Sequence, residues 1–395
     1  MKYFNLPVLG AICIGLFSCE KSEVKQEESL LNKAEVIFDK SYPEINDTYF
    51  NMKINHNDDL FLNGYETVIK VDKDGNLKWT VTGSPNSRTA NDLAPTKDGG
   101  CIVLFVEQLP YSRKYSLVKI SSAGAIEWEK TGENYEIYKI VVGDDDMIYG
   151  VADLKEDGYW SKNKPKLFKY TMDGEYLSSE FITDTRDEIS YQSELMYKLN
   201  NNNFVVGTFS SVTPERENYD FHIVEFDKDA NNISERNYGG YRNDHLMDIA
   251  ECPDGGLILM GYSNSKDGDI KSWRDELTYE NGGNAWVVRL GKNREIKWEK
   301  IMGGTEISWF RKAVYYNNKL LVAFHTTATD IDFQSPERPK GGFIVLDDQG
   351  NITDKKYIGE DMIYCAFDSQ GFLIMLTYNH DDYYGTYTPR LIKIR

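Results

Sequence analysis

The segment from Asn264 to Asp269 (NSKDGD) has residue types and spacing that can wrap a metal ion. Its side-chain oxygens alternate around a glycine, as they do in loops that bind calcium. The segment lacks the acidic ligand that ends an EF-hand loop, so an ordinary Asx turn is the alternative interpretation. If calcium binds here, Asp267 and Asp269 are the predicted ligands, and no other cofactor is expected.

Residues that commonly carry catalysis do not form a recognisable motif in this chain. The histidines are dispersed and show no HExxH or paired-ligand spacing; they are His56, His222, His245, His325 and His380. No GxSxG, Walker or Rossmann phrase occurs. Carboxylates are too abundant to select a glycosidase pair without distances. No catalytic residue is predicted, and a binding function is favoured over an enzyme.

Aromatic side chains in long polar insertions are the predicted binding residues. Exposed Tyr and Trp commonly anchor recognition surfaces, and such a mixture suits a glycan or a protein ligand. The alternative is that some of these rings only pin the loops to the rim. The predicted binding residues are Tyr159, Trp160, Trp273, Tyr279, Tyr383 and Tyr384.

A repeated phrase indicates how these insertions are positioned. An apolar strand, a polar turn and a further strand recur six times, and a seventh copy, LIKIR, is cut off by the C-terminus; the intervals are 48 to 64 residues. That period fits a four-stranded blade with its loops. The copies begin at Val68, Leu117, Leu167, Ile223, Val287, Phe343 and Leu391.

A second phrase, two apolar runs around a tight turn, also occurs seven times. Its turns are rich in Asn, Asp and Gly, which tolerate the positive φ that short hairpins require. They fall at 57–59, 97–100, 143–146, 200–203, 253–256, 317–319 and 368–371. Together the two phrases predict an all-β fold, a seven-bladed β-propeller of four-stranded antiparallel blades. A sandwich or an open solenoid is the alternative.

The two ends of the chain are expected to close the ring. The chain stops at the third strand of its last blade, LIKIR, and the segment from Glu35 to Tyr42 (EVIFDKSY) resembles an outer strand. Pairing them leaves no open edge. The predicted propeller therefore spans residues 35–395.

In such a ring, the connections from second to third strand and the crossings between blades share one face. The long insertions are predicted at these connections, which makes this the working face. Their expected bounds are 107–116, 152–166, 210–221, 263–285, 326–342 and 379–389.

The N-terminal segment is predicted to be a targeting signal. Lys2 precedes an apolar run from Leu6 to Phe17, which is too short for a transmembrane helix. The run ends in Leu16-Phe17-Ser18-Cys19, which resembles the lipobox of bacterial lipoproteins. That resemblance implies a signal peptide over residues 1–18, lipid on Cys19 and a flexible tether over residues 19–34. An ordinary signal peptide is the alternative.

Composition excludes some partners. The net charge of −18 disfavours nucleic acid, because phosphate binding needs a basic face. Cys101, Cys252 and Cys365 lie in apolar runs of separate blades, so they are expected to be buried core thiols and not a disulfide framework. The expected state is a monomer.

The stretch from Arg236 to Gly304 resembles blade repeats of secreted and lipid-anchored propellers of Gram-negative bacteria. The shared features are Gly239-Gly240, Asp244, Asp254-Gly255-Gly256, Asn264 to Asp269, Trp286 to Leu290 and Trp298 to Lys300. The phrase DKDGNLKW at Asp72 also resembles repeats of quinoprotein dehydrogenases and of the propeller lipoprotein that scaffolds outer-membrane protein assembly. The adjacent Cys pair common in quinone-binding sites is missing, which disfavours the redox enzyme.

The sequence therefore predicts a lipid-anchored binding protein of the outer membrane, at the cell surface or on the periplasmic side. Its long-loop face would hold a glycan or a protein. Two alternatives stay open: a carbohydrate-active hydrolase or lyase with a central-pocket site, and an outer-membrane assembly scaffold.

Overall fold

The computed structural model describes most of the predicted propeller. The described residues are 35–43, 45, 51–83, 88–108, 113–133, 136–155, 163–183, 191–213, 216–277, 283–316, 319–334, 341–358, 362–380 and 387–395.

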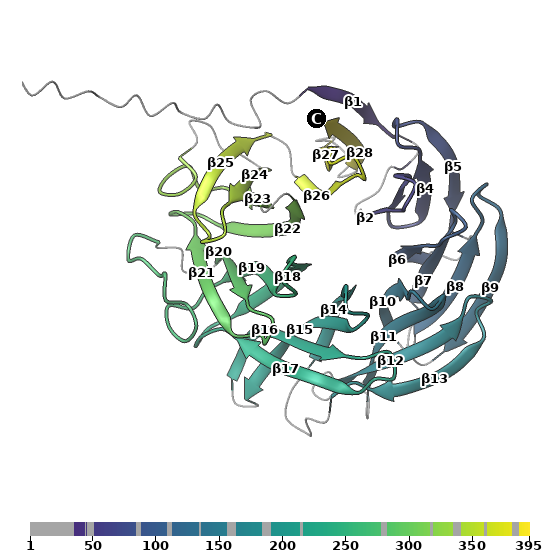
Figure 1. Cartoon of the computed structure of the whole chain (residues 1–395), viewed down its shortest axis with the longest axis horizontal. Helices are drawn as coiled ribbons and strands as arrows, with labels where there is room; N and C mark the ends of the chain where they lie inside the picture. The colour runs from purple at the N-terminus through teal and green to yellow at the C-terminus, as the bar shows by residue number, and fades with distance from the viewer. Residues whose placement is uncertain are drawn as a thin grey trace, which may run out of the picture.

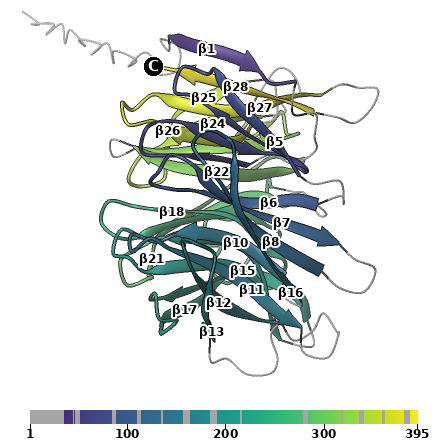
Figure 2. The same ribbon diagram turned by 90° about the vertical axis from the view of Figure 1, so that its right-hand side faces the viewer.

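Seven four-stranded antiparallel sheets surround a central axis, which confirms the predicted seven-bladed propeller (Figure 1). In each sheet the first strand lies nearest the axis and the fourth lies at the rim (Figure 1). Figure 2 shows the ring from the side, with the strands running between its two faces. Within the described residues, no helix is long and apolar enough to cross a membrane.

The strands follow the chain in order, blade by blade. Blade 1 contains β2 (Asn51–Ile54), β3 (Leu60–Asn63), β4 (Thr67–Val71) and β5 (Leu77–Thr82). Blade 2 contains β6 (Arg88–Pro95), β7 (Cys101–Gln108), β8 (Arg113–Ile120) and β9 (Ile126–Glu133). Blade 3 contains β10 (Glu136–Val142), β11 (Met147–Lys155), β12 (Asn163–Thr171) and β13 (Tyr176–Phe181). Blade 4 contains β14 (Tyr191–Lys198), β15 (Phe204–Thr213), β16 (Arg216–Phe226) and β17 (Asn232–Tyr238).

The remaining blades keep the same order. Blade 5 contains β18 (Asp244–Glu251), β19 (Leu257–Ser263), β20 (Asn284–Leu290) and β21 (Ile296–Met302). Blade 6 contains β22 (Ser308–Tyr316), β23 (Lys319–Thr326), β24 (Gly341–Leu346) and β25 (Ile352–Tyr357). Blade 7 contains β26 (Met362–Phe367), β27 (Leu373–His380) and β28 (Tyr387–Ile394), and its fourth strand is β1 (Val36–Ser41) from the other end of the described chain.

The ring closes as predicted, through antiparallel pairing of β1 with β28 (Figure 1). The guanidinium of Arg390 donates to both carboxylate oxygens of Asp39 at 2.6 Å. Phe38 and Tyr42 are buried, and the Tyr42 hydroxyl donates to the carbonyl of Gly75 in blade 1. The closing strand therefore covers the edge of blade 7 and also contacts the neighbouring blade.

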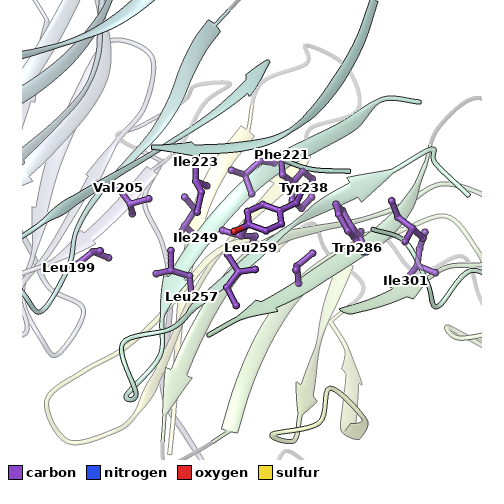
Figure 3. Close-up of a cluster of buried hydrophobic side chains, with 14 of the residues drawn as sticks. Leu199, Val205, Phe221, Ile223, Tyr238, Ile249, Leu257, Leu259, Trp286 and Ile301 are labelled. Atoms are coloured by element: carbon purple, nitrogen blue, oxygen red, sulfur yellow. The ribbon is translucent and has the colours of Figure 1, made fainter. Parts of the chain in front are cut away.

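Hydrophobic cores fill the spaces between neighbouring blades. One of them joins blades 4 and 5, where the rings of Phe221 and Trp286 lie 4.6 Å apart between their centroids (Figure 3). Successive side chains of a strand point to opposite faces of its sheet, so they contribute alternately to the cores on its two sides. The three predicted core thiols are buried and unpaired as expected, at Cys101, Cys252 and Cys365.

The faces of the ring carry different connections. We call the face with the first-to-second and third-to-fourth turns the turn face, and the opposite one the loop face. Most insertions predicted for the loop face are shorter in the structure than in the prediction. The strands that flank them continue beyond their last apolar residues. The ladders reach Gln108↔Arg113, Lys155↔Asn163, Thr213↔Arg216 and His380↔Tyr387. Backbone pairing needs no apolar side chain, so polar strand ends still form hairpins. Among the connections from second to third strand, 264–283 and 327–340 separate their strands by the most residues.

Candidate functional site

The loop face between blades 4 and 5 is organised around a crossing that contains two glycines, Gly239 and Gly240. Asp269 accepts the backbone N–H of Gly239 at 3.1 Å, and Asp267 accepts that of Tyr241 at 2.7 Å. A side chain at Gly240 would meet Asp267 Oδ1 at 2.6 Å. The crossing therefore needs glycine so that the loop of blade 5 can hold it closely.

The same arrangement recurs one blade later. Asp332 accepts the backbone N–H of Gly303 at 2.9 Å, and Asp330 accepts that of Thr305 at 3.0 Å. A Cβ at Gly303 would lie 1.9 Å from Asn284 Oδ1. Two successive loops thus use an Asp-x-Asp pair to fix the preceding crossing.

Asp267 and Asp269 are the predicted calcium ligands. Each uses one carboxylate oxygen to accept a backbone N–H of the crossing, 30 positions away for Asp269 and 26 for Asp267, so these bonds are not those of a local Asx turn. Within the described residues, no group of three or more His, Cys, Asp or Glu side chains is placed to hold a metal ion. Calcium binding by this pair stays a prediction.

A pair of carboxyl groups, Asp220 and Asp244, lies behind the crossing. A Cβ at Gly239 would meet Asp220 Oδ1 at 2.4 Å and Asp244 Oδ2 at 2.6 Å, so both groups crowd one point. Within the described part of the chain, Oδ1 of each carboxylate is buried without a hydrogen-bond partner. Burial raises the pKa of Asp220 to about 7, and the nearby charges of Asp244 and Asp269 add to the shift.

Asp244 is fully buried, and this burial raises its pKa to about 6. The N–H of Gly240 and the hydroxyl of Ser265 donate to its Oδ2 and favour the charged form, but they offset burial only in part. The two acids therefore form a site where a proton is held near neutral pH.

Glu299 of β21 anchors the long connection of blade 5. Its Oε1 accepts the backbone N–H groups of Lys271 and Ser272 at 3.0 and 2.6 Å. Its Oε2 accepts the Ser272 hydroxyl at 2.9 Å and the Trp286 indole N–H at 3.0 Å. Because this carboxylate is buried and receives four bonds, the loop is fixed against its blade.

A salt bridge joins the long connections of blades 5 and 6. The guanidinium of Arg274 donates to the carboxylate of Asp332. Lys355, at the position in β25 that Glu299 holds in β21, donates to the carbonyls of Asp332 and Phe333 at 2.9 and 3.2 Å. The described parts of the two loops therefore form one hydrogen-bonded surface.

Trp273, a predicted binding residue, lies on this surface. It is half-buried and packs against the core between blades 4 and 5, and the Lys266 ammonium lies 4.7 Å from the centroid of its ring. The ring is held in place by its packing and stacked beneath a cation. Both the predicted anchor role and the alternative, pinning the loop, are compatible with this position.

The other predicted site residues lie outside the described residues. They are Cys19, Tyr159, Trp160, Tyr279, Tyr383 and Tyr384.

Two stacked aromatic pairs on the loop face were missed in the sequence. His245 of β18 stacks on Tyr262 of β19, with centroids 5.3 Å apart and planes at 6°. Trp309 of β22 stacks on His325 of β23 at 4.4 Å and 11°, and the Arg311 guanidinium lies 5.5 Å from the Trp309 ring. All four rings are half-buried.

The two pairs occupy the same cross-strand position in successive blades. That position is at the loop-face end of the inner strands, next to the crossings. The sequence contains a signal for these pairs, because blades 5 and 6 each have an aromatic residue or histidine at both positions of the pair. It was overlooked because these residues belong to strands and not to insertions.

Polar residues on the inner strands meet near the axis. Lys312 Nζ lies 2.9 Å from Asp248 Oδ1, and the Tyr197 hydroxyl donates to the same oxygen. Desolvation lowers the pKa of Lys312, but the charge and hydrogen bond of Asp248 together with the neighbouring Tyr197 and Tyr364 outweigh it, so the pKa lies well above its ordinary value. Asp248 Oδ2 accepts the backbone N–H of Ala313 at 2.9 Å. The cluster joins blades 4, 5 and 6 and is internally neutralised.

Comparisons with known proteins support the fold and not a family. No protein-family model matches this chain, and no curated protein matches it in sequence. The chain is similar in structure to the WD40 domain of Pan2 from Neurospora crassa, at 10% identity and a TM-score of 0.56, covering 91% of this chain and 95% of that one.

Two bacterial proteins of unknown function are also similar in structure. One, from Bacteroides caccae, is 13% identical over 75% of this chain and 91% of that one, with a TM-score of 0.43. The other, from Dyadobacter fermentans, is 11% identical over 78% and 95%, with a TM-score of 0.48. At 10% identity, the similarity to the Pan2 domain indicates the propeller fold alone.

Proposed function

We propose that this protein is a binding scaffold that recognises a glycan or a protein partner with its loop face. The observation that carries the proposal is the pair of ring stacks, His245 with Tyr262 and Trp309 with His325, at one position of successive blades. Rings and cationic side chains on rigid strands are typical anchors of recognition surfaces. Trp273 adds a third ring on the adjoining loop surface.

The charge arrangement on the axis favours binding over hydrolysis. Glycoside hydrolysis usually needs two carboxyl groups on either side of the substrate. Asp248 is tied to Lys312 and to the Ala313 N–H. Asp92, at the equivalent position of blade 2, accepts the Asn51 amide and the Ile140 N–H. A neutralised, hydrogen-bonded carboxylate is poorly suited to act as a general acid or nucleophile.

We further propose that the protein is held at the outer membrane by a lipid on Cys19. The support is the match of Leu16-Phe17-Ser18-Cys19 to a lipobox after a short apolar run. Residues 19–34 are polar and charged, which suits a tether between the membrane and the propeller. A ligand would then be captured close to the cell envelope.

The test combines a glycan array with cross-linking on intact cells, using the full chain. Trp273→Ala and Trp309→Ala should weaken capture by about tenfold or more, since truncating a buried anchor typically costs about 2 kcal/mol. Asn57→Ala, an exposed turn-face change, should leave capture unchanged. Capture that survives both tryptophan changes in folded protein would contradict the proposal.

A further inference from the structure

A groove of about 960 Å³ lies on the turn face between blades 4 and 5. Its volume is at the upper end of the range of small-molecule sites, about 300–1,000 Å³. Blade 4 lines it with Asn200, Asn201 and Asn203 of its first hairpin and with residues 232–236 of β17, and blade 5 lines it with the turns at 253–255 and 292–294. The groove therefore lies on the opposite face of the propeller from the aromatic side chains of the loop face.

A buried ion pair forms the floor of the groove. Arg294 donates to Glu225 Oε2 through Nε at 2.8 Å and through Nη2 at 2.6 Å. The side chains are 4% and 6% exposed. Asn203 donates to Glu225 Oε1 at 3.0 Å, and Arg294 Nη1 donates to the Gly255 carbonyl at 2.9 Å. Every charge on the floor is paired, so the floor is rigid and neutral.

Glu225 departs from the pattern of the other blades. Five blades have a base at its position in the third strand: Lys70, Lys119, Lys169, Arg289 and Lys393. Four of these bases bind an acid in the first hairpin of their own blade: Asp59, Asp98, Asp254 and Asp368. In blade 4 the charge is reversed, and the partner comes from blade 5 instead.

Arg294 departs from the pattern as well. It is in the left-handed region with φ of 68°, in the turn between the third and fourth strands. In the corresponding turns, glycine has this conformation in four blades and Ala230 has it in blade 4; the glycines are Gly75, Gly124, Gly174 and Gly350. A larger residue there costs about 1 kcal/mol or more. Glu225 and Arg294, the two residues that differ from the pattern, bind each other. We therefore relate them to the groove and not to the general fold.

The walls of the groove are rich in side-chain amides. Five asparagines line it, and Asn200, Asn201 and Asn293 are exposed. Each amide can donate and accept, as can each hydroxyl of a sugar. Ile233, which is 51% exposed, supplies an apolar patch for the C–H face of a sugar ring.

The charges of the walls are largely compensated. Four carboxylates and three cationic groups line the groove. Asp254 is held by Arg289 and Lys297, and Glu251 accepts the backbone N–H of Asn200. A strongly charged ligand would gain little here. The chemistry favours a ligand that is neutral and rich in hydroxyl groups.

We propose that this groove is a second binding site, independent of the loop face, and that it takes a neutral oligosaccharide. Its hydroxyls would pair with the amides of Asn200 and Asn293 over the neutral floor formed by Glu225 and Arg294. The site lies on the turn face, so a sugar held there leaves the loop face open.

The test is affinity electrophoresis of the full chain in native gels that contain laminarin, dextran, pullulan or galactomannan. The net charge of −18 carries the protein through a neutral gel. At least one polysaccharide should retard the parent and the matched turn-face control Asn57→Ala to the same extent. The double change Asn200→Ala with Asn293→Ala should weaken retardation about tenfold, for the loss of two hydrogen-bonding partners.

These substitutions are at exposed positions, so melting temperatures should be unchanged, and Ile233→Ser provides a second groove variant with the same expected loss. Retardation by none of the four polysaccharides would overturn the proposal. So would retardation that survives both groove variants. If that retardation is lost in Trp273→Ala, the sugar binds the loop face, which supports the proposed function and not the groove.

Discussion

Asp220 in blade 4 occupies the position that Asn284 occupies in blade 5, and each side chain packs against the first glycine of a crossing. Asp244 and Ser308 are likewise equivalent, at the start of the following inner strands. One crossing is therefore backed by two acids, and the next by two neutral groups. A neutral group, either an amide or a protonated carboxyl group, fits this position. A carboxylate at Asp220 would instead lie beside the second acid, Asp244, and be repelled by its charge.

This difference predicts a pH dependence of stability. The pKa of Asp220 is about 7 in the folded protein and near 4 in the unfolded chain, so between these values the folded state binds more protons. The free energy of unfolding must then fall as pH rises from about 4 to about 7. Asp220→Asn should remove this term. It should stabilise the protein at pH 8 by about 1–2 kcal/mol, after allowing for solvent screening, and change little at pH 4.

The matched control is the reverse change in the neighbouring blade, Asn284→Asp. It should introduce a similar loss of stability above neutral pH, because the new carboxyl group also faces a close crossing. Denaturant melts of both variants from pH 4 to pH 8 measure the effect. Parallel pH profiles for parent and Asp220→Asn would show that the pair does not hold a proton.

The closing strand predicts a large effect of an internal deletion. Removing residues 35–42 takes away Phe38 and Tyr42 from the core and exposes the edge of β28. Burial lost on this scale costs several kcal/mol, so we expect a fall in melting temperature of about 10 °C or more, or insoluble protein. Lys40→Ala, which removes exposed contacts to blade 1 and to the Phe38 ring, is the control and should cost little. A deletion as stable as the parent would contradict closure by β1.

The axis cluster predicts strong coupling between two charges. Lys312→Met should destabilise the protein by about 3 kcal/mol, because Asp248 would be left buried without its counter-charge. Adding Asp248→Asn should restore most of that loss, since the double variant buries no charge. A double-mutant cycle in urea measures the coupling. Additive effects of the two changes would mean that the pair contributes no interaction energy.

Lipid attachment predicts a change in partitioning. Cys19→Ala should move the protein from membrane fractions to the soluble fraction, because a lipidated Cys19 is the proposed anchor. Cys13→Ala, inside the predicted signal peptide, is the control and should leave partitioning unchanged. Fractionation followed by detection of the propeller measures both. Firm membrane association of the Cys19 variant would disprove the anchor.

The sequence by itself determined the architecture. Seven copies of a strand phrase specify seven blades, since each copy needs a neighbour to bury its apolar face. The unmatched LIKIR at one end and EVIFDKSY at the other specify the closure, because an unpaired edge is unfavourable. Local pattern is sufficient wherever the structure repeats.

Only the tertiary structure decided which side chains meet. In the sequence, Trp309 and His325 look like ordinary strand residues. Only the register between β22 and β23 shows that their rings stack on each other. Glu225 and Arg294 are 69 positions apart, and neither looks unusual until the ring brings blade 5 against blade 4. The physical reason is that contacts between blades depend on how the sheets stack, and alternation along one strand carries no information about the strand beside it.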